Sequence, residues 1–354
     1  MTNFSSHFQS FRLITSLLMY RDGTSYLPKV EMSQFEGLNG ICPPVKIISP
    51  IKYRKKIIIL YPGASPYAEE HPQMEMLGIV LARNGYKVFI PRIPPLKILD
   101  ISVVNVEWFI CFYQWLLDVY QLESNDITMI GISYGGGIML KAYLQIKEFL
   151  TPPNLLMTHG TYADVESTLH FLLTGEISNQ GIQYKITPHE WGLIVLFQNY
   201  LKNLELGWDT GGVQKVINLH IQDKMNDRDM VKSKLPRSQQ NIVNAIISGK
   251  RTEEIMDLCQ QIMLNEIDTF QDLSPKYWCY KIQKKVFIFH GINDSMVPFT
   301  ESIQLAESIP DSELLISHIY EHKEIATNRN TYFKMKEFVK MGYFFSKFYY
   351  YNEN

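Results

Sequence analysis

The chain has 354 residues, of which 46% are hydrophobic and 20% charged, and its formal net charge is -2. These proportions are typical of a globular protein with a large core, and the charge provides no basic footprint for nucleic-acid binding. The default partner is therefore a small-molecule substrate. The most apolar long segment, residues 101–120, is too polar for a membrane span, because it contains Asn105, Glu107, Gln114 and Asp118.

The cysteines show no pattern of their own. Cys42, Cys111, Cys259 and Cys279 are scattered, without a Cys-x-x-Cys pair or zinc-ligand spacing. We expect reduced, mostly buried thiols and no metal or other cofactor. The N-terminus also lacks a Lys/Arg-led apolar run that ends in a cleavage site, so a cytoplasmic location is expected.

Residues 1–28 open with an apolar stripe at helical spacing, formed by Phe4, Phe8, Phe11, Ile14 and Leu18. This periodicity predicts an amphipathic helix that docks on the protein through the stripe. A membrane-surface helix is the alternative, which is disfavoured because the polar positions are Ser, Thr and Gln rather than Lys or Arg.

Strands and helices alternate through the next part of the chain. Residues 29–53 read as an early hairpin or meander. The following predicted elements are strand 55–61, helix 72–84, strand 86–90, helix 102–121, strand 127–131, a helix after residue 133 and strand 154–158. Such alternation predicts a mostly parallel, doubly wound sheet.

The pattern changes after the sixth strand candidate. From residue 162 to about 278 it is helical, with no convincing buried strand, and Thr187-Pro188-His189-Glu190 reads as the start of one of these helices. The sheet is expected to resume with strands 285–289 and 313–317. A final helix over residues 330–351, dense in Phe and Tyr, is expected to dock against the sheet.

The most informative stretch is Gly131-Ile-Ser133-Tyr-Gly135, which lies between a predicted strand and a predicted helix. Gly-x-Ser-x-Gly in this context is the pattern of a nucleophile elbow, a strained turn that exposes a serine hydroxyl. Both glycines are expected because strand and helix pass too closely for a Cβ atom. Here the chain resembles the α/β-hydrolases.

This resemblance implies a domain organisation. Residues 1–161 and 279–354 would form the two parts of an α/β-hydrolase core. Residues 162–278 would be a helical cap, inserted between strands 6 and 7 of the sheet, that covers the active site and shapes the substrate pocket.

The resemblance also implies an oxyanion hole. The loop after strand 55–61 would supply the backbone N–H of Ala64, and the residue after the nucleophile would supply the N–H of Tyr134. Tyr61-Pro62-Gly63 replaces the usual His-Gly start of this loop, so Ser65 is an alternative to Ala64. Backbone donors suit this role because they are already oriented when negative charge develops.

The acid and the histidine of a triad are assigned in the same way. The segment His290-Gly-x-x-Asp294-x-x-Val297-Pro298 matches the place where the family carries its acid, which makes Asp294 the candidate. A purely structural cap at Asp294, or Asp164 as the acid, are the alternatives. His322, in the turn after the last strand, is favoured over His318, which lies in the strand run.

Ser133, Asp294 and His322 follow one another in the chain order of this fold. They imply a serine hydrolase that cleaves a carboxylic ester or related acyl bond of a small, hydrophobic substrate. An acyltransferase and a catalytically silent binding protein are the alternatives within the fold. One alternative lies outside this fold. The glycines from Gly131 to Gly137 and the Tyr143-x-x-x-Lys147 pair resemble motifs of short-chain dehydrogenases. That family, however, carries its Tyr/Lys pair on a different helix from the one that follows its glycine turn.

Overall fold

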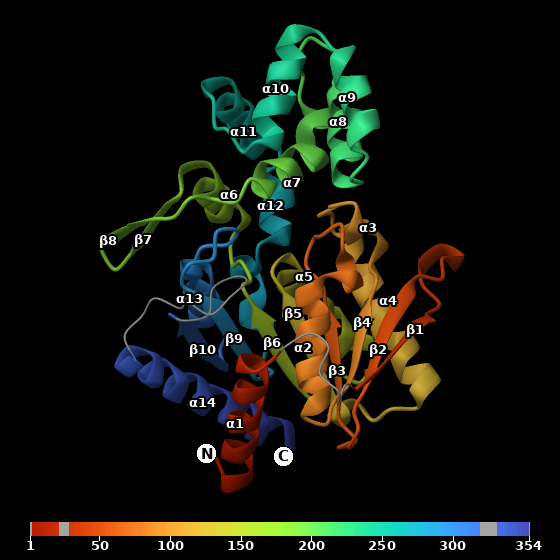
Figure 1. The fold of residues 1–354 in the computed structure, drawn as a ribbon, viewed down its shortest axis with the longest axis vertical. Coiled ribbons are helices and arrows are strands. Elements are labelled where there is room, and N and C mark those ends of the chain that lie inside the picture. The colour runs from red at the N-terminus through yellow and green to blue at the C-terminus, as the bar shows by residue number, and fades with distance from the viewer. Residues whose placement is uncertain (1, 21–27, 319–330, 354) are drawn as a thin grey trace.

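The computed structural model describes residues 2–20, 28–318 and 331–353. A large sheet lies between helical layers, and the inserted segment stands above one end of it (Figure 1). The strands of this sheet are β1 (Lys29–Gln34), β2 (Pro44–Ser49), β3 (Ile57–Tyr61), β4 (Lys87–Pro91), β5 (Ile127–Ile132), β6 (Leu155–His159), β9 (Val286–Gly291) and β10 (Ser312–Ser317).

The spatial order of the strands is β1-β2-β4-β3-β5-β6-β9-β10. Strand β2 runs antiparallel to both of its neighbours, and the other neighbouring pairs are parallel. The prediction of a mostly parallel, doubly wound sheet that begins with a hairpin is therefore confirmed.

Helices cover both faces of the sheet because its strands are apolar on both faces. In β3, Ile57, Ile59 and Tyr61 pack towards α4 and α5, whereas Ile58 and Leu60 pack towards α1, α2 and α14. The helices around the sheet are α1 (Phe4–Leu18), α2 (Pro72–Arg83), α3 (Pro94–Lys97), α4 (Val104–Tyr120), α5 (Tyr134–Phe149), α13 (Phe299–Ser308) and α14 (Thr331–Glu353), with short turns η1 (Leu38–Gly40), η2 (Ala68–Glu70) and η3 (Ser124–Asp126).

The insertion lies between the sixth and seventh strands of the sheet, as predicted, and builds an apolar core largely of its own residues. Its elements are α6 (Val165–Thr174), β7 (Glu176–Asn179), β8 (Ile182–Lys185), α7 (Trp191–Tyr200), η4 (Leu201–Asn203), α8 (Gly211–Ile221), α9 (Met225–Ser233), α10 (Arg237–Ile247), α11 (Glu253–Asn265) and α12 (Ile267–Leu273), followed by η5 (Pro275–Tyr277) and η6 (Cys279–Lys281). We retain residues 162 and 278 as its predicted limits.

Two details of the insertion differ from the prediction. Strands β7 and β8 form a hairpin whose turn residues, Gln180 and Gly181, both have positive φ, a two-residue turn without the more recognisable Asn-Gly sequence. The expected helix start at Thr187 is wrong, because α7 begins at Trp191. Instead the N–H of His189 donates to the carbonyl of Ser295 (2.9 Å), which ties this segment to the loop after β9.

Helix α1 forms where predicted but docks through another face. Its buried residues include Ser6, Gln9 and Ser10, whereas Phe4 and Phe11 of the predicted stripe are 88% and 66% exposed. The serine face approaches α14 closely, and the Ser10 hydroxyl donates to the carbonyl of Gly342 (2.7 Å). The expectation that the apolar stripe docks is therefore wrong for most of its residues.

Two further observations bear on the sequence predictions. Within the described ranges, no helix combines the length and apolarity needed to cross a bilayer. The four cysteines are unbridged: Cys259 and Cys279 are buried as expected, whereas Cys111 is half-buried and Cys42 exposed.

Candidate active site

Ser133 lies in the sharp turn between β5 and α5, with φ 51° and ψ -128°. A residue other than glycine seldom adopts such a conformation, which costs on the order of 1–3 kcal/mol and persists only where its surroundings impose it. Here the Ser133 N–H donates to the carbonyl of His159 (2.8 Å). The Ser133 carbonyl accepts from the Gly136 N–H (2.9 Å) and the Thr161 hydroxyl (3.1 Å).

The two glycines of the motif are required by close packing, as the sequence predicted. A Cβ atom at Gly131 would lie 2.5 Å from the Cα atom of Gly136. At Gly135 it would lie 2.2 Å from the carbonyl oxygen of Pro62, in the loop after β3. Strand, helix and loop therefore meet around Ser133 at distances that exclude any side chain.

The loop after β3 runs directly against Ser133. A Cβ atom at Gly63 would lie only 3.2 Å from the Ser133 Cβ atom. The N–H of Ser65 is engaged, because it donates to the carbonyl of Leu96 (3.1 Å), which favours Ala64 in the choice that the sequence left open. Tyr134 is the first residue of α5, so its N–H has no acceptor within the helix.

Ser133 borders two cavities, of about 390 Å³ and 110 Å³. The residues that line both are Ala64, Ser133, Val195 and Met296. Val195 belongs to α7 of the insertion and Met296 to the loop after β9. Sheet, insertion and loop therefore all contribute to the space around the serine.

Asp294 lies in the loop after β9 and is 2% exposed. Its Oδ1 atom accepts hydrogen bonds from the N–H groups of Met296 (2.8 Å) and Val297 (3.0 Å). Its Oδ2 atom lies 3.6 Å from Nε2 of the buried His290. Oδ1 therefore has a structural role, like the helix cap that the sequence offered as an alternative. It stabilises the turn before α13, however, and Asp294 is not the N-cap of that helix.

The favoured histidine, His322, lies outside the described residues. The competing His318 follows β10, where its N–H donates to Oε2 of Glu337 (3.0 Å) and its ring lies edge-on to Phe333. Among the described residues that line the two cavities beside Ser133, His318 does not occur.

Three histidines that were not predicted as site residues line the larger cavity: His71, His159 and His189. His159 ends β6, and the carboxyl ends of strands are where open α/β sheets place their ligands, so its position was a usable signal. For His71 and His189, backbone N–H groups donate to Nδ1 and hold the rings in place. Neither was recognisable from the sequence, because both positions depend on tertiary contacts.

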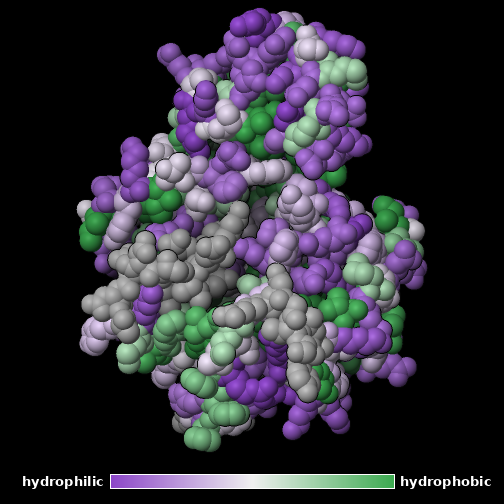
Figure 2. Space-filling view, viewed as in Figure 1, coloured by the Kyte–Doolittle hydropathy of each residue, from purple (hydrophilic) through white to green (hydrophobic). Residues whose placement is uncertain are grey.

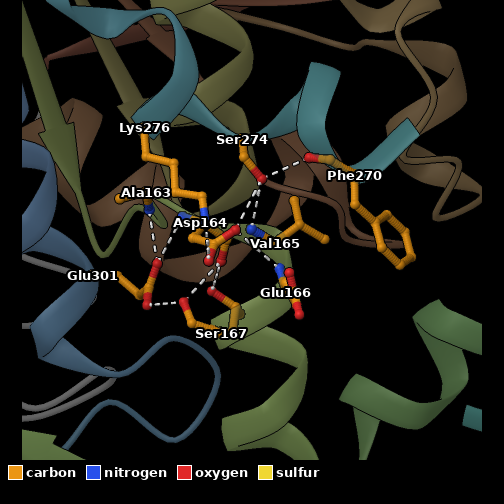
Figure 3. A network of polar contacts seen from close by, with 10 residues as sticks. Ala163, Asp164, Val165, Glu166, Ser167, Phe270, Ser274, Lys276 and Glu301 are labelled. Carbon is orange, nitrogen blue, oxygen red and sulfur yellow. Dashed lines mark hydrogen bonds and ion pairs between the residues drawn. The ribbon is translucent and has the colours of Figure 1, made fainter. Parts of the chain in front are cut away.

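Asp164, the alternative acid, belongs to a different polar network (Figure 3). It caps α6 by accepting from the N–H of Glu166, and its other oxygen forms an ion pair with Lys276 (2.7 Å). The Ser274 hydroxyl accepts from the N–H of Val165 and donates to the carbonyl of Phe270. This network joins the first and last helical turns of the insertion, so Asp164 has a structural role.

Glu301 of α13 connects this network to the core. Its carboxylate accepts from the N–H groups of Ala163 (3.0 Å) and Asp164 (2.8 Å) and from the Ser167 hydroxyl (2.5 Å) (Figure 3). Glu301 is 3% exposed, and this burial raises the pKa of its carboxyl group, although the three hydrogen bonds oppose the shift.

The dehydrogenase alternative is not supported by the arrangement of its residues. Tyr143 is packed in the apolar core beneath α5, where no substrate has access, and the Lys147 side chain donates to the carbonyl of Lys281.

The mostly parallel sheet, the strained serine after β5 and the insertion after β6 together define the α/β-hydrolase fold. No protein-family model and no curated protein matches the chain. Solved structures do match it. The uncomplexed acylaminoacyl peptidase of Pyrococcus horikoshii is 12% identical, with a TM-score of 0.51 over 90% of this chain and 41% of that one.

Two further solved structures are similar. A putative dipeptidyl aminopeptidase IV of Bacteroides ovatus is 12% identical, with a TM-score of 0.50 over 92% of this chain and 36% of that one. An esterase domain of a Rhodothermus marinus protein is 12% identical, with a TM-score of 0.45 over 90% of this chain and 97% of that one. The chain therefore spans about two fifths of the length of the two peptidases, and at such identity the likeness shows the fold alone.

Replacing Gly135 by alanine should disrupt the turn, because the new Cβ atom would collide with the Pro62 carbonyl. We expect the free energy of unfolding to fall by about 2 kcal/mol or more, measured by urea denaturation. Gly342→Ala is the matched control, since no described residue outside its own stretch of α14 lies within 4 Å of its Cβ position. It should be neutral or stabilising by up to about 1 kcal/mol. Equal effects of the two substitutions would contradict the packing described here.

Glu301 should impart a pH dependence to stability. Its carboxyl pKa is higher in the folded state than the ordinary 4.5, so the folded state loses stability as pH rises between these two values. The free energy of unfolding of Glu301→Gln should therefore rise relative to wild type from pH about 4 to about 8. If the free energy of unfolding of Glu301→Gln instead falls relative to wild type over this range, the pKa of Glu301 is lowered by folding rather than raised. Glu301→Ala should cost about 2–4 kcal/mol at pH about 4, because it removes the acceptor of two buried N–H groups, and this cost should also decrease as pH rises.

Proposed function

We propose that this protein is a serine hydrolase that cleaves a carboxylic ester, or a related acyl bond, of a small molecule with an apolar acyl group. The observation that carries the proposal is Ser133, held in a strained conformation at the point where the two cavities meet. Strained residues cluster at active sites and ligand-binding sites, and here the strained turn places the serine at the border of both cavities.

In the proposed mechanism, His322 accepts the proton of the Ser133 hydroxyl while Oγ attacks the carbonyl carbon of the ester. The N–H groups of Ala64 and Tyr134 donate to the oxygen that becomes negatively charged. His322 then protonates the leaving alcohol. In the second half, His322 deprotonates a water molecule that attacks the carbonyl carbon of the acyl-enzyme. The bond from that carbon to Ser133 Oγ then breaks, the acid leaves, and His322 returns the proton to Oγ. Asp294 accepts the Nδ1–H of His322 throughout.

The smaller cavity suits the acyl group because its lining is mostly apolar and three of its hydroxyl groups already donate hydrogen bonds within the protein. The hydroxyl of Tyr134 donates to the carbonyl of Ile101 (2.6 Å), that of Tyr162 to Leu273 (3.2 Å) and that of Thr168 to Asp164 (2.7 Å). None of the described residues that line this cavity is charged. A charged group would lose its hydration there without compensation, so a neutral, apolar group is favoured.

The larger cavity suits the leaving group. It is wider, and it carries histidine and glutamine side chains, including His159, His189 and Gln73. These groups can form hydrogen bonds with a polar alcohol or amine portion. The ester would thus lie across Ser133 with its two halves in different cavities.

The first test is labelling with a fluorophosphonate, a probe that reacts with activated serines. We expect an adduct on Ser133, located by peptide mass spectrometry, and no labelling of Ser133→Ala or His322→Ala. Ser65→Ala and His318→Ala are the matched controls and should label like wild type. A folded wild-type protein that stays unlabelled would refute an activated nucleophile and favour the silent binding protein.

The division between the cavities predicts an acyl-chain preference. A cavity of about 110 Å³ has room for a short chain of methylene groups. Leu169→Phe should narrow this space and lower kcat/KM for octanoate esters by about tenfold or more, with acetate esters much less affected. Gln73→Trp, in the larger cavity, should leave the chain-length preference unchanged. A uniform loss over all chain lengths after Leu169→Phe would argue against this acyl site.

An acyltransferase would use the same residues and the same acyl-enzyme. It differs only in the acceptor, an alcohol or thiol in place of water. Product analysis after adding such acceptors separates the two reactions.

A further inference from the structure

Helix α1 presents its aromatic residues to solvent. Phe4, Phe8 and Phe11 are 88%, 56% and 66% exposed, on the side opposite the serine face that contacts α14. Exposing three phenylalanines on a single helix is unfavourable in water. It indicates a surface that is covered by something else.

Helix α14 adds to the same surface. Its inner face, with Phe344, Phe345 and Phe348, is buried against the sheet. On its other face, Met335 and Val339 are 62% and 71% exposed, and Tyr343 is also exposed. We call these three residues together with Phe4, Phe8 and Phe11 the α1–α14 face.

The two helices belong to one layer. Both pack on the side of the sheet that α2 also covers, and they meet where Ser10 contacts Gly342, which is next to Phe11 on one helix and Tyr343 on the other. Their outer surfaces therefore point away from the sheet together. Figure 1 shows α1 beside α14, and Figure 2 shows hydrophobic residues over these helices in the lower part of the view.

The charges on this face indicate what covers it. Arg12, Lys334, Lys336 and Lys340 lie on α1 and the first half of α14, whereas Glu337 is the only acidic residue there. Glu337 is 1% exposed and forms an ion pair with Lys340 (2.7 Å). The face is basic on a chain whose formal net charge is -2.

We propose that the α1–α14 face docks on an anionic lipid surface, with its aromatic and aliphatic side chains in the interfacial region and its cations against the headgroups. Exposed aromatic residues flanked by cations are the features that favour such binding. A second copy of the chain fits less well, because it would bring lysines against lysines. This docking requires no membrane span and does not depend on the proposed catalysis.

The surface also lies close to the candidate active site. Beneath it, Leu13 and Leu17 of α1 line a small apolar cavity of about 50 Å³. This cavity shares Leu77, Ile132 and His159 with the larger cavity beside Ser133. Docking through the α1–α14 face would therefore hold the larger cavity near the lipid surface.

The test is co-sedimentation of the full chain with vesicles of phosphatidylcholine alone or with a third of the lipid replaced by phosphatidylserine. Wild type should bind the phosphatidylserine vesicles, and added salt should weaken the binding. The combined substitution Phe4→Ser, Phe8→Ser, Phe11→Ser should lower the partition coefficient by more than about tenfold. Lys336→Glu should lower it by about five- to thirtyfold.

Matched control variants distinguish binding through the α1–α14 face from non-specific binding to the vesicles. Phe149→Ser removes a phenylalanine that is 82% exposed at the end of α5, and Lys250→Glu reverses an exposed charge in the insertion. Both should bind like wild type, with thermal unfolding of all variants checked by circular dichroism. Failure of wild type to sediment would overturn the proposal. So would a dimer, measured by light scattering, that the triple substitution dissociates, because it would make a second copy the occupant.

Discussion

The close approach of three backbone segments around Ser133 is the constraint on which the rest of this structure depends. Strand β5, helix α5 and the loop after β3 meet so tightly that a Cβ atom at Gly135 would lie 2.2 Å from a carbonyl oxygen. Close packing at that point forces Ser133 into its strained conformation and places the backbone of Ala64 and Tyr134 beside it. Since β5 is a strand of the central sheet, and α5 and the loop follow directly from strands β5 and β3, the sheet positions all three segments.

The insertion takes its position from buried polar contacts rather than from the sheet. Its first and last turns are held together by the contacts of Asp164, Ser274 and Lys276, and Glu301 of α13 anchors the first turn. A second tie, from His189 to the carbonyl of Ser295, joins the insertion to the loop that carries Asp294. These contacts hold in place the insertion, whose residues form part of the walls of the two cavities.

Helix α1 illustrates how local periodicity and tertiary packing can disagree. Its apolar stripe predicts a docking face, but Ser6 and Ser10 are buried instead and Phe4 and Phe8 are exposed. Serine is small enough for the backbones of α1 and α14 to approach closely, and its hydroxyl can donate to a nearby carbonyl. A small polar face can therefore dock as well as an apolar one. The phenylalanines then become available for another surface, which gives the helix two distinct roles.

The sequence by itself determined the strands of the large sheet, their alternation with helices, the place of the insertion and the turn at Ser133. These features depend on local apolar runs and on glycines at short spacing, which are visible in the chain. Tertiary structure alone decided which side of α1 is buried, that Asp164 serves the insertion, and that His71 and His189 share a cavity with Ser133. These features depend on which segments, distant in the sequence, pack together, and the residue pattern of a single segment does not predict them.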